Sequence, residues 1–349
     1  MGSMRFTRVN IESFGYELAP NVVSSDLLEQ RLAPVYAALG IAPGQIAALT
    51  GVRERRYWNR GRLMWEGAAA AGRKALDAAG VPPAEVDILI FASVCRDHLE
   101  PATACAVAEA LGISGHAEIY DISNACLGVL NGMINVATAI ESGRAHTGLI
   151  VACESAREIV DITIERLCAR PDMESFKRSL ATMTGGSGAA AVLLRDTENS
   201  RSGRRLVGGV VRTAPEHHRL CRWGPPVGVS DKVPMEARTD AAAVLQNGVV
   251  LATHTWTAFL EELGWQPALI DRTICHQVGE GHRHAFLQAV GIPLEKDYPT
   301  YGFLGNMGTV SLPMTAALAE ERGFLQPGHR VALLGIGSGL NCLMLGVQW

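Results

Sequence analysis

The chain has 349 residues, 48% of them hydrophobic and 37 of them glycine, which suits a compact α/β protein with two core-bearing halves. With 31 basic and 35 acidic residues, the net charge is −4. This gives no support to nucleic-acid binding, so an anionic ligand would have to bind at a local patch of basic residues.

The eight cysteines form no C-x-x-C pair, no signal peptide is recognisable, and no apolar run approaches the roughly 20 residues of a membrane helix. We therefore expect reduced thiols, a cytosolic location and no membrane span. Met1-Gly-Ser-Met4 resembles a cloning remnant and is left out of the fold prediction.

Predicted strands and helices alternate through the first half of the chain. The run Val86-Asp-Ile-Leu-Ile-Phe-Ala-Ser-Val94 is almost continuously apolar, which is typical of a strand buried on both faces. Residues 155–184 carry mixed charge, and we expect a helical insertion there, over the entrance of a site. The expected strands cover residues 5–18, 86–94, 117–122, 146–153 and the end of the Gly-rich stretch 184–192; the expected helices cover residues 25–39 (capped by Ser25), 64–79, 102–111 and 126–142.

The second half repeats this order of elements. Helices are expected over 240–263, 281–290 and 310–322, and strands over 269–278, 330–336 and 341–348. Three pairs of matching elements are separated by a common offset of about 180 residues, which indicates internal duplication. We predict two halves, residues 4–197 and 198–349, with parallel-rich sheets covered by helices in a layered α/β arrangement.

The functional interpretation depends on Asp121-Ile-Ser-Asn-Ala-Cys-Leu-Gly-Val-Leu-Asn-Gly-Met133. Here a strand-like run ends in small polar residues, and a small, apolar helix begins near Cys126. A thiol at the positive end of a helix dipole is expected to favour the thiolate, the form that attacks carbonyls. The alternative for a lone cysteine in an apolar stretch is a buried structural thiol.

Two later stretches support the catalytic alternative, Ile274-Cys-His-Gln-Val278 and Gly302-Phe-Leu-Gly-Asn-Met-Gly308. In the duplicated scheme Asn306 occupies the strand-to-helix turn that matches Cys126, while His276 ends a strand. Because sites in such sheets form beyond the carboxyl ends of the strands, the three residues can converge. A thiol nucleophile with an imidazole and an amide able to donate to an oxyanion is a coherent set, although a single histidine is more often structural.

The order Cys…His-Gln…Gly-Asn, with Gly335-Ile-Gly-Ser-Gly339 near the end, resembles the thiolase superfamily and its β-ketoacyl-ACP synthase III branch. Thr50-Gly-Val-Arg-Glu-Arg and Gly305-Asn-Met-Gly-Thr-Val-Ser-Leu-Pro313 resemble further signatures of that branch. The resemblance implies a five-layered αβαβα thiolase fold and an obligate homodimer. It also implies an acyl-enzyme on Cys126, with His276 and Asn306 binding an enolate oxygen. The backbone N–H groups of Cys126 and Ser338 would hold the oxyanion.

One departure from synthase III enzymes changes the predicted chemistry. Those enzymes usually carry an aromatic residue before Pro101, in a segment that reaches into the partner subunit, whereas this chain has Glu100. Arg96-Asp-His-Leu-Glu-Pro101 resembles the OleA-type enzymes, which join two fatty acyl chains head to head. A decarboxylating synthase needs no base, but condensation with a simple acyl-CoA requires removal of an α-proton, for which a carboxylate in an apolar tunnel is suited. The alternative for Glu100 is a carboxylate that stabilises a helix N-terminus.

The basic turn Thr50-Gly-Val-Arg-Glu-Arg-Arg-Tyr57 offers Arg53, Arg55 and Arg56 as contacts for the phosphates of coenzyme A. Two departures weaken this assignment, because Leu49 and Gly279-Glu-Gly281 stand where related enzymes often carry basic residues. The histidines form no metal-binding pattern, so we expect no metal and no cofactor apart from coenzyme A thioesters as substrates.

We therefore predict a cytosolic, homodimeric acyltransferase that condenses two long-chain acyl-CoAs without decarboxylation and forms a 2-alkyl-3-keto acid. Such an acid would be a precursor of olefins or β-lactones for downstream enzymes that process β-keto acids. The alternatives are a decarboxylative synthase that uses a malonyl thioester, a cysteine hydrolase with a Cys-His-Asn triad, and a non-catalytic subunit of a heterodimer.

Overall fold

One nine-stranded sheet organises the chain in a computed structural model that describes residues 4–113, 115–225 and 235–349. The first part of the strand order is β5-β4-β6-β7-β1 and the second is β8-β13-β12-β11, with the two parts joined through the pairing of Asn10 with Arg205. The strands are β1 Val9–Leu18, β4 Ile88–Phe91, β5 Glu118–Asp121, β6 Thr147–Glu154, β7 Gly188–Asp196, β8 Arg205–Thr213, β11 Arg272–Cys275, β12 Arg330–Gly337 and β13 Asn341–Gln348.

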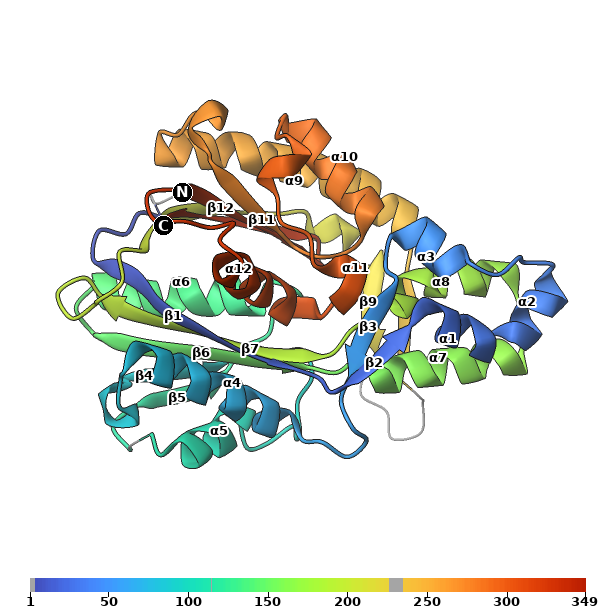
Figure 1. The fold of residues 1–349 in the computed structure, drawn as a ribbon, viewed down its shortest axis with the longest axis horizontal. Coiled ribbons are helices and arrows are strands. Elements are labelled where there is room, and N and C mark those ends of the chain that lie inside the picture. The colour runs from blue at the N-terminus through green and yellow to red at the C-terminus, as the bar shows by residue number, and fades with distance from the viewer. Residues whose placement is uncertain (1–3, 114, 226–234) are drawn as a thin grey trace.

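Helices cover and separate the two parts of this sheet (Figure 1). The central helices α6 (Gly128–Glu141) and α12 (Ser311–Glu321) share one hydrophobic cluster with strands of both parts. On the outer faces, α4 (Met64–Ala79) and α5 (Thr103–Leu111) pack on β4, β6 and β7, while α9 (Ala241–Leu263) and α10 (Glu280–Val290) belong to a cluster with β11, β12 and β13. Helix, sheet, helix, sheet and helix therefore follow one another, which confirms the predicted five-layered thiolase fold.

The two parts of the sheet match each other element by element. β4 runs parallel to β5 and β6, and β11 runs parallel to β12. From β4 to β11 the offset is 272 − 88 = 184 residues, and from α6 to α12 it is 311 − 128 = 183. The division into halves at residue 197, between β7 and β8, remains a prediction.

Two predicted elements near the N-terminus were wrong in detail. The helix predicted for residues 25–39 is divided at Leu32 into α1 (Ser25–Arg31) and α2 (Ala33–Leu39), because Pro34 has no N–H to continue the hydrogen-bond ladder. Its cap is Ser24, whose Oγ accepts from Leu27 N. The basic stretch predicted as a turn contains strand β3 (Glu54–Tyr57), which pairs with β2 (Asn21–Ser24).

The segment expected as a helical insertion forms α7 (Arg157–Ala169) and α8 (Met173–Met183), and both pack against the hairpin of β9 (Cys221–Gly224) and β10 (Glu236–Thr239). No helix in the described part of the chain is both long and apolar enough to cross a membrane. Met1, Gly2 and Ser3, which the sequence suggested were a cloning remnant, lie outside the described residues. The remaining short helices are α3 Gln45–Thr50, η1 Pro83–Glu85, η2 Pro215–His217, η3 Pro267–Leu269, η4 Leu294–Lys296, α11 Tyr301–Leu304 and η5 Gly308–Val310.

Candidate active site

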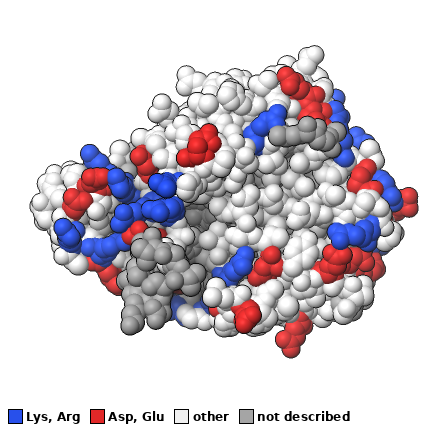
Figure 2. Space-filling view, turned by 180° about the vertical axis from the view of Figure 1, so that it is seen from behind, with Lys and Arg blue, Asp and Glu red and all other residues white. Residues whose placement is uncertain are grey.

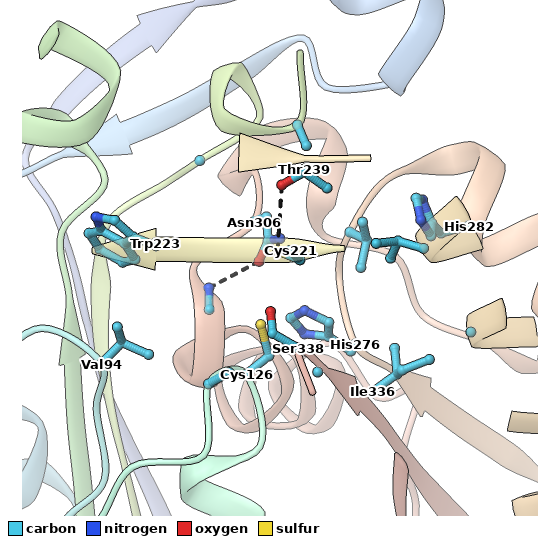
Figure 3. A pocket seen from close by; sticks show the side chains of 18 of the residues that line it. Val94, Cys126, Cys221, Trp223, Thr239, His276, His282, Asn306, Ile336 and Ser338 are labelled. Carbon is cyan, nitrogen blue, oxygen red and sulfur yellow. Dashed lines mark hydrogen bonds between the residues drawn. The ribbon is translucent and has the colours of Figure 1, made fainter. Parts of the chain in front are cut away.

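A cavity of about 690 Å³ lies where the two halves of the fold meet, and Cys126, His276, Asn306 and Ser338 all line it. Figure 3 shows Cys126, His276 and Ser338 close together, with Asn306 above them and Cys221 and Thr239 of the β9–β10 hairpin beyond it. The rest of the wall is largely apolar and includes Val244, Phe286 and Ile336. The predicted set of thiol, imidazole and amide is thus brought to one concave site.

A strained turn presents Cys126 to the cavity. Ala125 has φ 46°, in the left-handed region that residues with a side chain rarely adopt, and Leu127 N donates to Asn124 O across the turn at 2.9 Å. Helix α6 then begins at Gly128, two residues after the thiol. The sequence placed the helix start at Cys126 itself, whereas in the structure the cysteine belongs to the turn.

The expectation of a stable thiolate is wrong for the unliganded site. Burial raises the pKa of Cys126 to about 12, with further contributions from Cys221 and Glu154. At this position the loss of solvation outweighs the favourable helix dipole. The resting nucleophile is therefore a neutral thiol that has to lose its proton as it attacks.

His276 follows the end of β11 and is also uncharged. Its backbone N–H donates to Leu334 O at 2.9 Å, which continues the β11–β12 pairing to the cavity wall. Burial lowers the pKa of His276 to about 4, with a smaller contribution from His282. Among the described residues, the buried Nδ1 has no hydrogen-bond partner. A neutral imidazole combines one N–H donor with one lone pair, so it can stabilise an oxyanion or accept a proton.

Asn306 is held with its amide oriented. The side-chain oxygen Oδ1 accepts from Gly308 N at 3.0 Å, which leaves the amide N–H₂ available as a donor toward the cavity. Gln277 fixes the preceding segment, because its Oε1 accepts from Thr300 N and Tyr301 N at 2.8 and 3.1 Å. The His-Gln pair therefore links the strand that carries His276 to the segment that leads to Asn306.

The turn between β12 and β13 lies directly against the nucleophile. A Cβ added at Gly337 would lie 3.4 Å from Cys126 N and 3.2 Å from Leu127 Cγ, so a larger residue here would require the Leu127 side chain to shift. Asn341 ties the two segments together, since its Nδ2 donates to Asn124 Oδ1 at 3.0 Å and to Ser338 O at 3.3 Å. The geometry suits an oxyanion held by the backbone N–H groups of Cys126 and Ser338, although that role remains a prediction.

Glu100 is not part of the cavity wall of its own chain. It is exposed, and it follows Leu99, an apolar side chain that is 95% exposed. The segment is pinned at both ends, because the Asp97 carboxylate accepts from the first N–H groups of α4 and Asp121 accepts from those of α5. Between these anchors, residues 98–101 form a projecting tip.

The structure does not support Arg55 as a contact for phosphates. Its side chain is fully buried and donates to Ser25 Oγ and Met183 O, both at 3.0 Å. Burial also lowers the pKa of Arg55. Arg56 donates to Ala19 O, and neither Arg56 nor the exposed Arg53 lines the cavity.

A different set of arginines surrounds a smaller cavity of about 170 Å³ beside the first. Arg222 and Thr239 line both cavities, so the two adjoin. Figure 2 shows Lys and Arg side chains gathered on one part of a face whose other charges are more scattered. The arginines of the small cavity are Arg178, Arg219, Arg222 and Arg238.

Sequence reasoning missed three further contributors to the site. Glu154, a carboxylate in the cavity wall, could have been predicted from the sequence, because it is a charged residue at the carboxyl end of an apolar strand. No sequence pattern points to Asn341 or Cys221, because their positions depend on turns that come together only in the folded chain. Among the described residues, no group of three or more His, Cys, Asp or Glu is arranged to hold a metal ion.

Comparison with known proteins identifies the family. Residues 120–211 and 260–349 match the two sequence families described as 3-oxoacyl-[acyl-carrier-protein] synthase III and its C-terminal part. The acyl-CoA:acyl-CoA alkyltransferase of Shewanella oneidensis is 52% identical over 99% of this chain and 100% of its own length. The chain belongs to the acyl-CoA:acyl-CoA alkyltransferase family, in the synthase III branch of the thiolase superfamily. The alkyltransferase of Xanthomonas campestris is 37% identical over 99% of this chain and 100% of its own length.

Solved structures of the family agree with the fold. A crystal structure of Xanthomonas campestris OleA superposes with a TM-score of 0.93 at 36% identity, covering 99% of this chain and 98% of that one. Another OleA structure, with bound lauric acid and lauroyl-CoA, superposes with a TM-score of 0.92 and covers 99% of this chain and all of that one. The resemblance inferred from the motifs and the predicted thiolase fold are both confirmed.

The protonation state of Cys126 is testable by alkylation. With a pKa of about 12, its thiolate fraction should rise about tenfold per pH unit, so labelling by iodoacetamide should keep rising between pH 7 and pH 9. Peptide mapping by mass spectrometry would follow Cys126, with the exposed Cys105 as a reference for reagent activity. A rate that levels off below pH 8 would contradict the assignment of a neutral thiol.

Proposed function

We propose that this protein condenses two long-chain acyl-CoAs without decarboxylation and releases a 2-alkyl-3-keto acid. The observation that carries the proposal is the convergence of Cys126, His276 and Asn306 on a largely apolar cavity in a chain of this family. Two of its relatives are named acyl-CoA:acyl-CoA alkyltransferases, and an OleA structure of Xanthomonas campestris contains bound lauric acid and lauroyl-CoA.

Acylation comes first. The Cys126 sulfur attacks the thioester carbonyl of the first acyl-CoA, the bond to the coenzyme A sulfur breaks, and the thiol proton leaves with free coenzyme A. Because Cys126 is neutral at rest, its proton is transferred to the departing coenzyme A sulfur as the new carbon–sulfur bond forms. The N–H groups of Cys126 and Ser338 stabilise the oxyanion.

Condensation then requires a carbanion. In the proposed homodimer, Glu100 of the other subunit removes an α-proton from the second acyl-CoA, and His276 and Asn306 donate to the enolate oxygen. The enolate carbon attacks the acyl group on Cys126, which forms the new carbon–carbon bond and releases the Cys126 sulfur. The tip supports this arrangement because Leu99 and Glu100 are exposed and therefore accessible to a second subunit.

Hydrolysis completes the sequence. Water cleaves the thioester of the condensed product to give coenzyme A and a 2-alkyl-3-keto acid. Such an acid calls for a downstream enzyme that processes β-keto acids on the way to β-lactones or olefins. We also propose that the protein acts in the cytosol and needs no cofactor beyond its thioester substrates.

Each alternative function makes a different demand on the site. A decarboxylative synthase would depend on a malonyl thioester and would leave Glu100 without a chemical task. A cysteine hydrolase would need His276 to activate Cys126 toward water attack alone, with no carbon–carbon bond formed. A non-catalytic subunit would have no use for a complete set of Cys126, His276, Asn306 and Glu100.

The proposed function can be tested with one long acyl-CoA and no malonyl thioester. We expect one acyl adduct per subunit, mapped to Cys126 by intact-mass and peptide analysis, together with a condensed keto acid. Cys126→Ala should abolish both, while His276→Ala should still acylate and condense about 100- to 1000-fold more slowly. An enzyme that only releases the free fatty acid would be a hydrolase, and one inert without malonyl thioester would be a decarboxylative synthase.

The role of Glu100 predicts complementation between inactive subunits. Glu100→Gln keeps size and hydrogen bonding but removes the basicity, so Cys126 should still be acylated while condensation falls about 100- to 10,000-fold. Mixing Glu100→Gln with Cys126→Ala subunits should restore some condensation, because one site then combines an intact Cys126 with an intact partner Glu100. Unchanged condensation by Glu100→Gln would exclude the carboxylate as the base.

The arginine-lined cavity is the best candidate for the phosphates of coenzyme A. It adjoins the large cavity at Arg222, so a thioester that reaches Cys126 can extend its nucleotide end to this point. Arg178 pairs with Glu174 and Arg238 pairs with Glu236, but within the described ranges no ion pair is recorded for Arg219 or Arg222. Arginine forks match phosphate geometry, which favours this cluster over the exposed Arg53.

Substrates with and without the nucleotide test this assignment. Arg222→Gln should raise KM for a long acyl-CoA about tenfold, as expected for one lost charge-assisted hydrogen bond, and leave the acyl-pantetheine thioester unaffected. Arg144→Gln is the control, since that exposed arginine pairs with Glu118 and lines neither cavity. Equal effects on both thioesters would contradict a phosphate contact.

A further inference from the structure

A buried carboxylate at the end of β6 has no role in the reaction described above. Glu154 is 4% exposed and lines the cavity beside Val94 and Ser155. Its two carboxylate oxygens accept backbone hydrogen bonds, from Val94 N at 2.9 Å and from Cys95 N at 3.1 Å. Both side-chain oxygens are thus used to hold the chain where it leaves β4.

Val94 and Cys95, the residues that Glu154 holds, lead directly into the exposed tip that carries Glu100. Between Cys95 and Glu100 the chain has one further side-chain anchor, the Asp97 carboxylate at the start of α4. Cys95 also meets the residue after Glu154, since its Sγ donates to Ser155 O at 3.4 Å. The direction in which the tip projects therefore depends on how firmly Glu154 holds residues 94 and 95.

The same carboxylate lies against the loop of Asn306. A Cβ added at Gly308 would meet the Glu154 carboxyl group at 3.5 Å, and Gly308 N is the donor that orients the Asn306 amide. One buried side chain thus contacts the enolate-binding loop of its own subunit and the root of the segment that serves the other subunit.

Burying a carboxylate at this position costs free energy, which is unusual for a side chain that only holds the backbone. No charged partner offsets its burial in the described part of the chain, and burial raises the pKa of Glu154 to about 7. Two backbone N–H groups at one side chain nevertheless need two acceptors, which only a carboxylate supplies in this geometry. A glutamine would turn its N–H₂ group toward one of these donors.

We propose that Glu154 is a positioning residue that aligns Glu100 for the partner's site while it supports the Asn306 loop of its own site. The inference rests on the proposed function, because it requires Glu100 to act across a dimer. Its distinctive consequence is an effect in trans: a change at Glu154 in one subunit impairs condensation at the Cys126 of the other.

A mixed dimer, purified through two different tags, isolates this effect. One subunit is unmodified and the other carries Cys126→Ala, so acylation occurs only on the unmodified subunit and condensation depends on Glu100 of the variant subunit. Adding Glu154→Gln to the Cys126→Ala subunit should lower condensation about tenfold or more, because a small displacement of a reacting group is costly in rate. Acylation of the unmodified Cys126 should not change. Glu154→Asp, which keeps the charge but shortens the reach, should give a smaller loss and serves where the Gln variant does not assemble.

Glu29→Gln provides the matched control in the same subunit. Glu29 is another buried carboxylate that accepts from two backbone N–H groups, those of Gly44 and Ile46, but it does not line the cavity. Condensation equal to that of the parent mixed dimer in the Glu154 variants would overturn the inference, as would an equal loss with Glu29→Gln. If the parent mixed dimer itself forms no condensed product, the proposed function fails, and the inference fails with it.

Discussion

A single hydrogen bond between distant parts of the chain holds the catalytic turns together. Val129 N, in the first turn of α6, donates to Thr309 Oγ1 at 2.7 Å, and both residues are buried. Thr309 belongs to the short helix between Asn306 and α12, so this bond joins the starts of the two central helices. The first turn of a helix has N–H groups without partners in the helix, and here one of them finds its acceptor in the other half of the fold. The position of Cys126 relative to the Asn306 amide is thereby constrained by the contact of α6 with the short helix η5.

The same arrangement places the predicted reactive side chains in a largely apolar cavity. Burial favours the thiol form of Cys126 and the neutral imidazole of His276, so these two groups add no charge at rest to the charged residues of the cavity wall, which include Glu154 and Arg222. A site of neutral, oriented donors suits a reaction in which negative charge appears only in the oxyanion and the enolate. In such surroundings each donor acts more strongly than it would in water, because little solvent screens it. The helix dipole at Cys126 is better regarded as support for the developing charge than as the cause of a stable thiolate.

The sequence could predict the helices and strands that have a regular pattern of apolar residues, and the site residues that lie at the ends of those elements. Helix α4 was predicted with its observed bounds, and His276 follows a strand as predicted. Cys126 lies between strand β5 and helix α6 as predicted, but Asn306 follows the short helix α11, so the strand predicted before it was wrong. What failed depended on tertiary contacts. Arg55 is charged and lies next to exposed residues in sequence, yet its side chain is turned inward to two buried acceptors, which no local pattern reveals. The thiol of Cys126 was misjudged for a similar reason, since burial raises its pKa in a cavity lined by residues far apart in the sequence.

The separation of base and nucleophile has a physical rationale in this arrangement. Glu154 already lies in the cavity wall and raises the pKa of Cys126, and a second carboxylate held permanently beside the thiol would further oppose both the thiolate and the oxyanion that acylation forms. The exposed tip of residues 98–101 keeps Glu100 out of its own cavity, and its anchors are the Asp97 and Asp121 carboxylates, which accept hydrogen bonds from the first N–H groups of α4 and α5. A carboxylate that enters from another chain can meet the α-carbon of the second substrate from the side away from Cys126. The two subunits of the proposed dimer would then divide the reaction, one holding the acyl group and the enolate oxygen while the other takes the proton.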